Sequence, residues 1–284
     1  MLQQYSYKLQ RESVMDVRQT ITDKIIEVLS KGGKAPWQCP FTRHPLPLNY
    51  KTNRQYRGIN TLILWLESHI QGYTNNYWIG FNQARTLNAR VRKGEKGTPI
   101  IVCNPVIKEE ETEEKSKTYL FFKTEYVFNI DQIEELDFKE TENNIREIAE
   151  INNIIDFHKI KVKHQGERAY YSPNDDYINM PFKSKFKDNE GYYSTLLHEM
   201  THWTGHKDRL NRLNKYDIED RAYEELIAEM GASFLCAEFG ITPNIENNAN
   251  YINSWLQALK NDKNFIFKAS HDATKAVNYI TQTI

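Results

Sequence analysis

The sequence has few cysteines and no long apolar segment. Three of its 284 residues are cysteines, and they lie far apart, at Cys39, Cys103 and Cys236. This number and spacing fit neither the disulfide framework of a small secreted domain nor a cysteine-rich metal site. No apolar run approaches the roughly 20 residues that span a bilayer. The sequence therefore argues against a disulfide scaffold and against a helical membrane protein.

The first residues, Met1 to Lys8, are polar and lack the apolar core of a signal peptide. We therefore expect a cytoplasmic protein with no membrane partner. Hydrophobic residues make up 39% of the chain and aromatic residues 12%, with a mean hydropathy of -0.71. Because disordered chains lack this aromatic content, the composition predicts a soluble globular protein of one large or two ordinary domains.

The net charge of -1 conceals a strong asymmetry along the chain. Residues 1–104 contain 15 Lys or Arg and 6 Asp or Glu, a net charge of +9. The remaining 180 residues contain 22 basic and 32 acidic residues, a net charge of -10. Clustered cations gain free energy by displacing counterions from phosphates, so this asymmetry indicates a polyanion-binding part joined to something else. A solvated basic face is the alternative interpretation.

The order of predicted elements indicates an α+β fold in two domains. In the N-terminal half, residue patterns predict helices over 14–30, 60–67 and around 83–85, and strands over 98–102 and 119–128. The basic, glycine-bounded turn at 89–97 is typical of a hairpin. An acidic polar stretch then predicts a linker. Our assignment is a mixed α/β nucleic-acid-binding domain at 1–138, including a flexible tail at 1–13, a linker at 139–144, and a second domain at 145–284.

The second domain is predicted to begin with a helix over 145–158. Short strands are expected over 160–162, 168–172 and 176–181, with a turn before the last of them. We expect this last strand to lie at the edge of a sheet, where an extended peptide can pair with it.

The segment His198-Glu199-Met200-Thr201-His202 is the strongest chemical signal in the sequence. Two histidines four residues apart project from one face of a helix, about one turn apart, and can hold one metal ion. A carboxylate beside them, here Glu199, is placed to take a proton from an attacking water as a general base. The motif predicts a zinc-dependent hydrolase of the peptidase type. An amphipathic helix with surface histidines is the structural alternative.

A third ligand is expected on a second predicted helix, residues 222–236. Its apolar side chains share one face, whereas Glu225 and Glu229 lie together on another side among small residues. Small neighbours allow a close approach to another helix, so these carboxylates can reach a metal; a solvated acidic stripe is the alternative. The Glu-x-x-Ala-Glu spacing resembles the Glu-x-x-Ala-Asp helix of gluzincin peptidases. This resemblance implies that Glu225 is the ligand and that Glu229 holds a ligating histidine.

A different third ligand is implied by a second resemblance. The run from His198 through Gly205 to Asp208 is similar to the metzincin motif in its aspartate variant, in which Asp208 would bind the metal. His206 is a further neighbouring donor. We favour Glu225, because Asp208 and the residues that follow it, 209–212, are equally typical of a solvated loop.

The N-terminal half interleaves cations with aromatic residues. Single-stranded nucleic acid is held by this combination, because cations follow the phosphates and aromatic faces stack on unpaired bases. Trp65 and Trp78 are expected in the core instead. The predicted DNA-binding residues are Trp37, Tyr50, Lys51, Arg54, Tyr56, Arg57, Arg85, Arg90, Arg92, Lys93 and Lys96.

Several segments together resemble one known family, the ArdC-type antirestriction proteins. In the N-terminal half these are Pro36-Trp37, Tyr56-Arg57-Gly58-Ile59-Asn60, Trp78-x-x-x-x-Gln83-Ala84 and Val91-Arg92-Lys93-Gly94-Glu95-Lys96-Gly97. In the C-terminal half they are the run from His198 to His206 and the run from Glu224 to Glu229. The resemblance covers nearly the whole chain, in the order of the family.

The resemblance implies a single-stranded-DNA-binding domain followed by a zincin-like metallopeptidase domain. It also implies a protein of plasmids or other mobile elements that protects incoming DNA from host restriction. The expected cofactor is Zn2+, with Mn2+ as another possible ion, and the expected partners are single-stranded DNA and a protein substrate met on DNA. The alternative is a non-catalytic protein that coats single-stranded DNA and has a structural or relic metal site.

Overall fold

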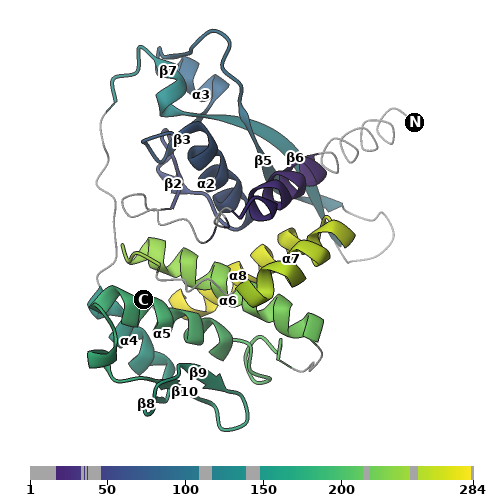
Figure 1. Cartoon of the computed structure of the whole chain (residues 1–284). Helices are drawn as coiled ribbons and strands as arrows, with labels where there is room; N and C mark the ends of the chain where they lie inside the picture. Colours follow the sequence, from purple (N-terminus) through teal and green to yellow (C-terminus); the bar gives the residue numbers. More distant parts are fainter. Residues whose placement is uncertain are drawn as a thin grey trace.

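The computed structural model describes residues 17–32, 35, 37, 46–108, 117–138, 148–213, 218–243 and 249–282. The predicted tail at 1–13 and the predicted linker at 139–144 lie outside these residues. Figure 1 shows the N-terminal strands on one side of the molecule and the C-terminal helices on the other. A small sheet lies at the far end of the C-terminal part.

A five-stranded sheet forms the centre of the N-terminal half, in the order β2-β1-β3-β6-β5. All 11 residues of β5 pair with β6 in an antiparallel register that runs from Thr98↔Val127 to Lys108↔Lys117. The predicted helices 60–67 and 83–85 are present as α2 and α3. The bounds are β1 Leu48–Asn49, β2 Arg54–Gln55, α2 Ile59–Gln71, β3 Tyr77–Gly80, α3 Phe81–Thr86, β4 Arg90–Val91, β5 Thr98–Lys108, β6 Lys117–Asn129, the 3-10 turn η1 Ile130–Gln132 and β7 Ile133–Glu134.

The prediction of a hairpin at 89–97 was wrong, because the strands on either side of the turn do not pair with each other. β4 pairs with β7 in a separate two-stranded sheet, whereas β5 pairs with β6. Opposite charges support the observed pairing, because Arg90 makes ion pairs of 2.7 Å with Glu134 and 2.8 Å with Glu135. The turn therefore separates two sheets instead of joining two strands of one hairpin.

The C-terminal half begins with α4 and a three-stranded sheet in the order β8-β10-β9. The bounds are α4 Ile148–His158, β8 Val162–His164, β9 Tyr170–Ser172, β10 Tyr177–Met180 and the 3-10 turn η2 Lys183–Lys185. The prediction that the last strand lies at an edge was wrong. β10 pairs on both sides, with β8 in parallel and with β9 in antiparallel orientation. Ile178 and Met180 are fully buried, as expected for a central strand.

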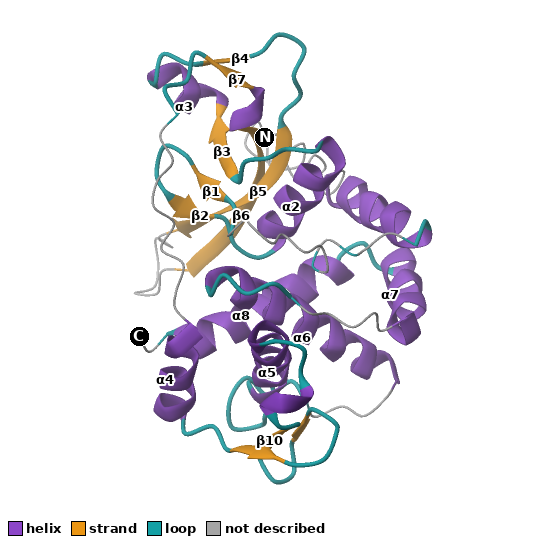
Figure 2. Cartoon of the chain, turned by 60° about the vertical axis from the view of Figure 1, so that its left-hand side comes forward, coloured by secondary structure: helices purple, strands orange, loops and turns teal. Residues whose placement is uncertain are grey.

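Four helices complete this half. α6 packs against both α5 and α8, and Figure 2 shows these helices between the N-terminal strands and the small C-terminal sheet. Their bounds are α5 Asn189–Trp203, α6 Ile218–Glu238, α7 Ala249–Asn261 and α8 Phe265–Thr281. The side chain of Asp188 caps α5 by accepting a hydrogen bond from the Gly191 backbone N–H at 2.8 Å. No helix of the described ranges is both long and apolar enough to cross a membrane.

The largest hydrophobic core joins the two halves of the chain. Buried residues of the helical segment 17–30, among them Ile25 and Leu29, belong to the same cluster as the apolar residues of α5 to α8. Trp65 of α2 also belongs to it and packs on Phe234 of α6, with ring centroids 5.9 Å apart. The sheet of the N-terminal half has small clusters of its own, one of them around Trp78.

Trp37 belongs to this shared core, which corrects its predicted role in stacking on DNA. The residue is 1% exposed, and its ring meets that of Trp255 edge to face at 5.8 Å. Its backbone oxygen accepts a hydrogen bond of 2.5 Å from Ser233. An indole held in this way has no face available for a base.

Candidate metal centre

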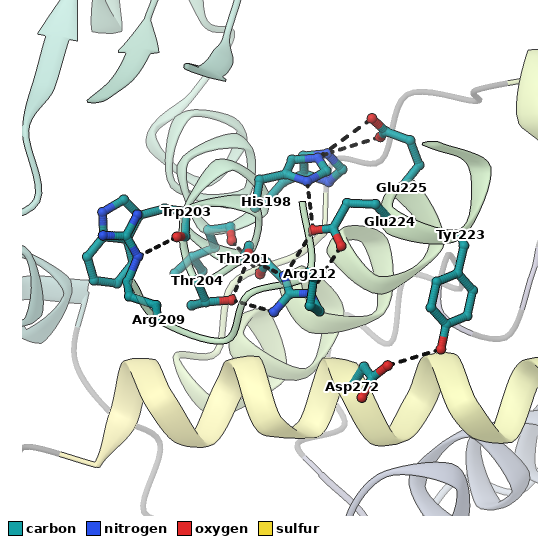
Figure 3. Close-up of polar contacts among 12 residues, drawn as sticks. His198, Thr201, Trp203, Thr204, Arg209, Arg212, Tyr223, Glu224, Glu225 and Asp272 are labelled. Carbon is teal, nitrogen blue, oxygen red and sulfur yellow. Dashed lines mark hydrogen bonds and ion pairs between the residues drawn. The ribbon is translucent and has the colours of Figure 1, made fainter. Parts of the chain in front are cut away.

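Helix α5 presents His198 and His202 on one face, as the spacing predicts. Their ring centroids are 4.8 Å apart, and the two Nε2 atoms are 3.2 Å apart. Helix α6 brings Glu225 to the same point, with carboxylate oxygens 3.5 Å from His198 Nε2 and 3.7 Å from His202 Nε2 (Figure 3). One donor atom from each of these three residues lies within 4.8 Å of the others. The predicted ligand set is therefore assembled.

The donor set suits a divalent cation. Two imidazole nitrogens and one carboxylate oxygen are the protein ligands of a common type of catalytic zinc site, which keeps a further position open. The side chains are partly accessible, with exposures of 22% for His198, 13% for His202 and 25% for Glu225. The three side chains are therefore not sealed from solvent.

Close packing of α5 and α6 makes this arrangement possible. A Cβ atom at Gly231 of α6 would lie 2.6 Å from Cγ2 and 2.9 Å from Oγ1 of Thr201 in α5. Thr201 is fully buried and its hydroxyl donates to the Leu197 backbone oxygen at 2.9 Å, so moving it aside would break this hydrogen bond. Glycine at this position lets the two helices approach closely enough to bring Glu225 to the histidines.

Gly231→Ala is therefore expected to destabilise the protein and weaken metal binding. Alanine favours a helix by about 1 kcal/mol relative to glycine, whereas overpacking a core costs about 1 to 3 kcal/mol. We expect a net loss of up to about 2 kcal/mol in the free energy of unfolding, measured by denaturant titration. The double variant Thr201→Ala/Gly231→Ala removes the clash and should recover metal affinity. A single variant with wild-type stability and wild-type metal affinity would contradict this account of the helix contact.

A carboxylate that the sequence analysis did not select holds one of the histidines. Glu224 Oε1 lies 3.2 Å from Nδ1 of His202, so it fixes the ring while Nε2 faces the other donors. Arg212 clamps this carboxylate by donating from Nε to Oε2 at 3.0 Å and from Nη2 to Oε1 at 2.9 Å. Sequence reasoning assigned the supporting role to Glu229 instead. Glu229 is 1% exposed on α6, and its contact with a histidine stays a prediction.

Two arginines of the loop after α5 are packed, which corrects in part the interpretation of residues 209–212 as a solvated loop. Arg209 lies over the ring of Trp203 at 4.0 Å and forms an ion pair with Asp176 of 2.5 Å. Arg212 also donates to Thr204 Oγ1 at 3.0 Å and to the Thr201 backbone oxygen at 2.9 Å. Figure 3 shows both arginines turned toward the end of α5. The loop therefore supports the metal centre through Arg212.

Asp208, the rival third ligand, lies away from the other donors. Its side chain is 73% exposed, and its carboxylate is 3.5 Å from Nδ1 of His206. Among the described residues, the group able to hold a metal contains Glu225 and not Asp208. The geometry therefore favours the Glu225 assignment.

The carboxylates dominate the electrostatics of the site. Burial lowers the pKa of His202, but Glu224 and Glu225 outweigh burial and raise this pKa well above its usual value. Burial raises the pKa of Glu225, but hydrogen bonds and charges from His198 and His202 outweigh it and lower this pKa. Glu199, the predicted base, is 7% exposed beside His198 on α5, and its negative charge also favours the charged form of His202. The concentration of negative charge favours a bound cation.

The predicted DNA-binding cations lie at the surface of the N-terminal half. They are all exposed: Lys51, Arg54, Arg57, Arg85, Arg90, Arg92, Lys93 and Lys96. Arg92 makes an ion pair of 3.0 Å with Glu95. Tyr56 is half-buried, and Tyr50 packs edge to face on Tyr77 at 6.0 Å. The structure leaves these cations accessible to a polyanion.

Comparison with known protein families divides the chain into two matching parts. Residues 15–128 match the family described as the N-terminal domain of anti-restriction factor ArdC. Residues 149–272 match the family described as zincin-like metallopeptidase. This order is the one that the resemblance in the sequence implies.

Solved structures of a similar protein cover nearly the whole fold. The metal-free crystal structure of antirestriction ArdC protein from the R388 plasmid is 38% identical, with a TM-score of 0.80 over 94% of this chain and 97% of that chain. The Mn(II)-bound structure is 39% identical, with a TM-score of 0.79 over 93% of this chain and 97% of that chain. The manganese-bound relative and the three assembled donors together support a divalent metal ion at this centre.

Two curated relatives are much longer proteins. Both are DNA primase TraC from Escherichia coli, 33% and 35% identical over 92% of this chain. The chain spans 26% of the length of the first and 20% of the second. The similarity therefore concerns one segment of each primase.

Proposed function

This chain belongs to the family of ArdC antirestriction proteins, and from this membership we propose that it protects the incoming DNA of a mobile element from host restriction. In this proposal the N-terminal half binds single-stranded DNA, and the metal centre hydrolyses peptide bonds in a protein met on that DNA. The observation that carries the hydrolytic part is the assembly of His198, His202 and Glu225 beside Glu199.

We assign each residue of the centre one task. His198, His202 and Glu225 hold the ion, for which we propose Zn2+, with Mn2+ as the alternative. When bound, a divalent ion polarises a carbonyl oxygen and makes water more acidic. Glu199 accepts the proton of the attacking water and returns it to the leaving amine. Glu224 and Arg212 keep the His202 ring in its binding orientation.

Two observations support the DNA-binding part. Residues 1–104 have a net charge of +9, and their predicted DNA-binding cations are exposed wherever their side chains are described. The similar primases are DNA-processing proteins by name, which associates this kind of chain with DNA. A basic surface binds phosphates by releasing counterions.

The affinity of the whole protein for a single-stranded oligonucleotide is therefore expected to fall steeply as salt rises. If about four phosphates are contacted, log K falls with log salt at a slope of about -3, because the slope is about -0.7 per phosphate for single strands. A fluorescence anisotropy titration between low and moderate salt measures this slope. Affinity that does not change with salt would remove the DNA-binding part of the proposal.

A further inference from the structure

The N-terminal half contains a surface hollow of ≈ 560 Å³, within the size range of small-ligand sites. It is lined by the β1–β2 turn, the start of α3 and the facing parts of β5 and β6. Ile100 and Val127, which are 5% and 4% exposed, contribute its most buried apolar side chains. The hollow belongs to the sheet of the N-terminal half and not to the metal centre.

Two exposed aromatic residues line this hollow. Phe81 is 52% exposed and Tyr126 is 57% exposed, more than any other aromatic residue described in the N-terminal half. Exposed apolar groups that gather at a hollow rimmed by polar residues commonly mark a binding site. An aromatic face stacks on the flat face of a base, whichever base it is.

The polar part of the lining is ordered by a hydrogen-bond network. The Asn49 oxygen accepts from the Thr52 backbone N–H at 3.0 Å, so its Nδ2 is turned to donate to Tyr56 Oη at 3.1 Å and to Gln83 Oε1 at 3.0 Å. The Gly80 backbone N–H donates to the same Gln83 oxygen at 2.9 Å. Because a backbone N–H can only donate, these contacts fix which way both amides face.

This network leaves two donors for a ligand. Tyr56 receives the Asn49 hydrogen bond, and Gln83 uses its oxygen twice. Among the described hydrogen bonds, neither the Tyr56 hydroxyl proton nor the Gln83 Nε2 group is engaged. The carboxylate of Glu125, another lining residue, is an acceptor that also pairs with Lys123. The hollow thus offers both donors and an acceptor, which the edge of a nucleobase can match.

One cation lines the hollow, and two more lie on the elements that form one side of it. Arg54 lines its rim, and Lys51 in the same turn donates to Thr86 Oγ1 of α3 at 2.6 Å, next to Arg85. All three cations are exposed. Glu125 is 48% exposed and pairs with Lys123, but its carboxylate still makes that wall of the hollow less favourable for a phosphate than the side of Arg54. A ligand with a neutral planar part inside and phosphates outside fits this distribution of charge.

We propose that this hollow binds one unpaired nucleobase of single-stranded DNA, stacked against Phe81 or Tyr126, with the flanking phosphates at Lys51, Arg54 and Arg85. The inference rests on the proposed DNA-binding function and deepens it. A base in a duplex is stacked and paired on both sides, so it cannot enter without being flipped out. The hollow would therefore give the protein its preference for single strands.

The test compares the wild type with Phe81→Ala/Tyr126→Ala on two single-stranded oligonucleotides of equal length, one of thymidines and one of abasic sites. The wild type is expected to bind the thymidine strand about 10- to 100-fold more tightly, because stacking contributes on this scale per base. The double variant should lose this difference while its salt slope stays unchanged, since its cations remain.

Phe157→Ala is the matched control, because Phe157 is 59% exposed on α4 and lies outside the hollow. This variant should bind both strands like the wild type. Equal affinity of the wild type for both strands, with a steep salt slope, overturns the base site and leaves the DNA-binding function intact. Failure of the wild type to bind either strand overturns the function itself. The wild-type comparison holds even if the double variant does not fold.

Discussion

Glu199→Gln is expected to lower the rate of peptide hydrolysis by about 100-fold to 10,000-fold, the usual contribution of a general base. The substitution keeps the size and polarity of the side chain but removes its ability to accept a proton from water. Glu199 is not one of the three assembled donors, so metal content should stay at the wild-type level. Hydrolysis of an unstructured protein substrate, followed with both proteins at equal bound metal, measures the effect.

Glu190→Gln is a matched control for this substitution. Glu190 lies in the first turn of the same helix, and it accepts a hydrogen bond from the Thr242 backbone N–H at 2.9 Å. Its loss should leave hydrolysis within about twofold, because surface substitutions rarely affect a distant site. Undiminished hydrolysis by the Glu199 variant would contradict the assignment of the base.

Glu225→Gln is expected to weaken metal binding by at least about 100-fold, beyond the 10- to 100-fold typical of residues that only support a ligand. A neutral amide replaces the anionic donor and leaves two histidines to hold the ion. Asp208→Asn is the natural control, because it removes the same charge from the rival position, which is 73% exposed. Titration of the metal-stripped proteins with Zn2+ and Mn2+ compares the two variants.

The two candidate third ligands, Glu225 and Asp208, predict opposite results for the Glu225→Gln and Asp208→Asn variants. With Glu225 as the ligand, the Asp208 variant binds like the wild type. Wild-type affinity in the Glu225 variant together with a loss in the Asp208 variant would restore the metzincin-like assignment. The structure favours the first outcome, because the two Glu225 oxygens lie 3.5 Å and 3.7 Å from the histidine nitrogens.

The ligands could be predicted because each belongs to a regular local pattern. A four-residue spacing fixes two histidines on one helix face, and the period of α6 separates Glu225 from the apolar side of the helix. Helix periodicity also predicted α2 and α4, and strand propensity predicted β5 and β6. These inferences depend on neighbours in the sequence, which the backbone geometry places directly.

The errors share a different cause, since they depend on tertiary partners. Arg212 returns from a loop to hold Glu224 against His202, and no motif that contains Glu224 assigns it this role. Trp37 follows a proline, and its neighbours in the sequence do not indicate that Trp255 packs against its ring. The central position of β10 depends on the pairing order of three short strands, which their similar composition does not reveal.

The most direct test of the proposed function is protection of unmodified DNA that enters a restricting host. Cells containing either the wild-type protein or Glu199→Gln, at matched protein level, would be compared for survival of the incoming DNA. If protection depends on peptide hydrolysis, the wild type protects and the variant does not, although both bind metal and single-stranded DNA. Full protection by the variant would contradict the hydrolytic account and favour a protein that acts by coating DNA.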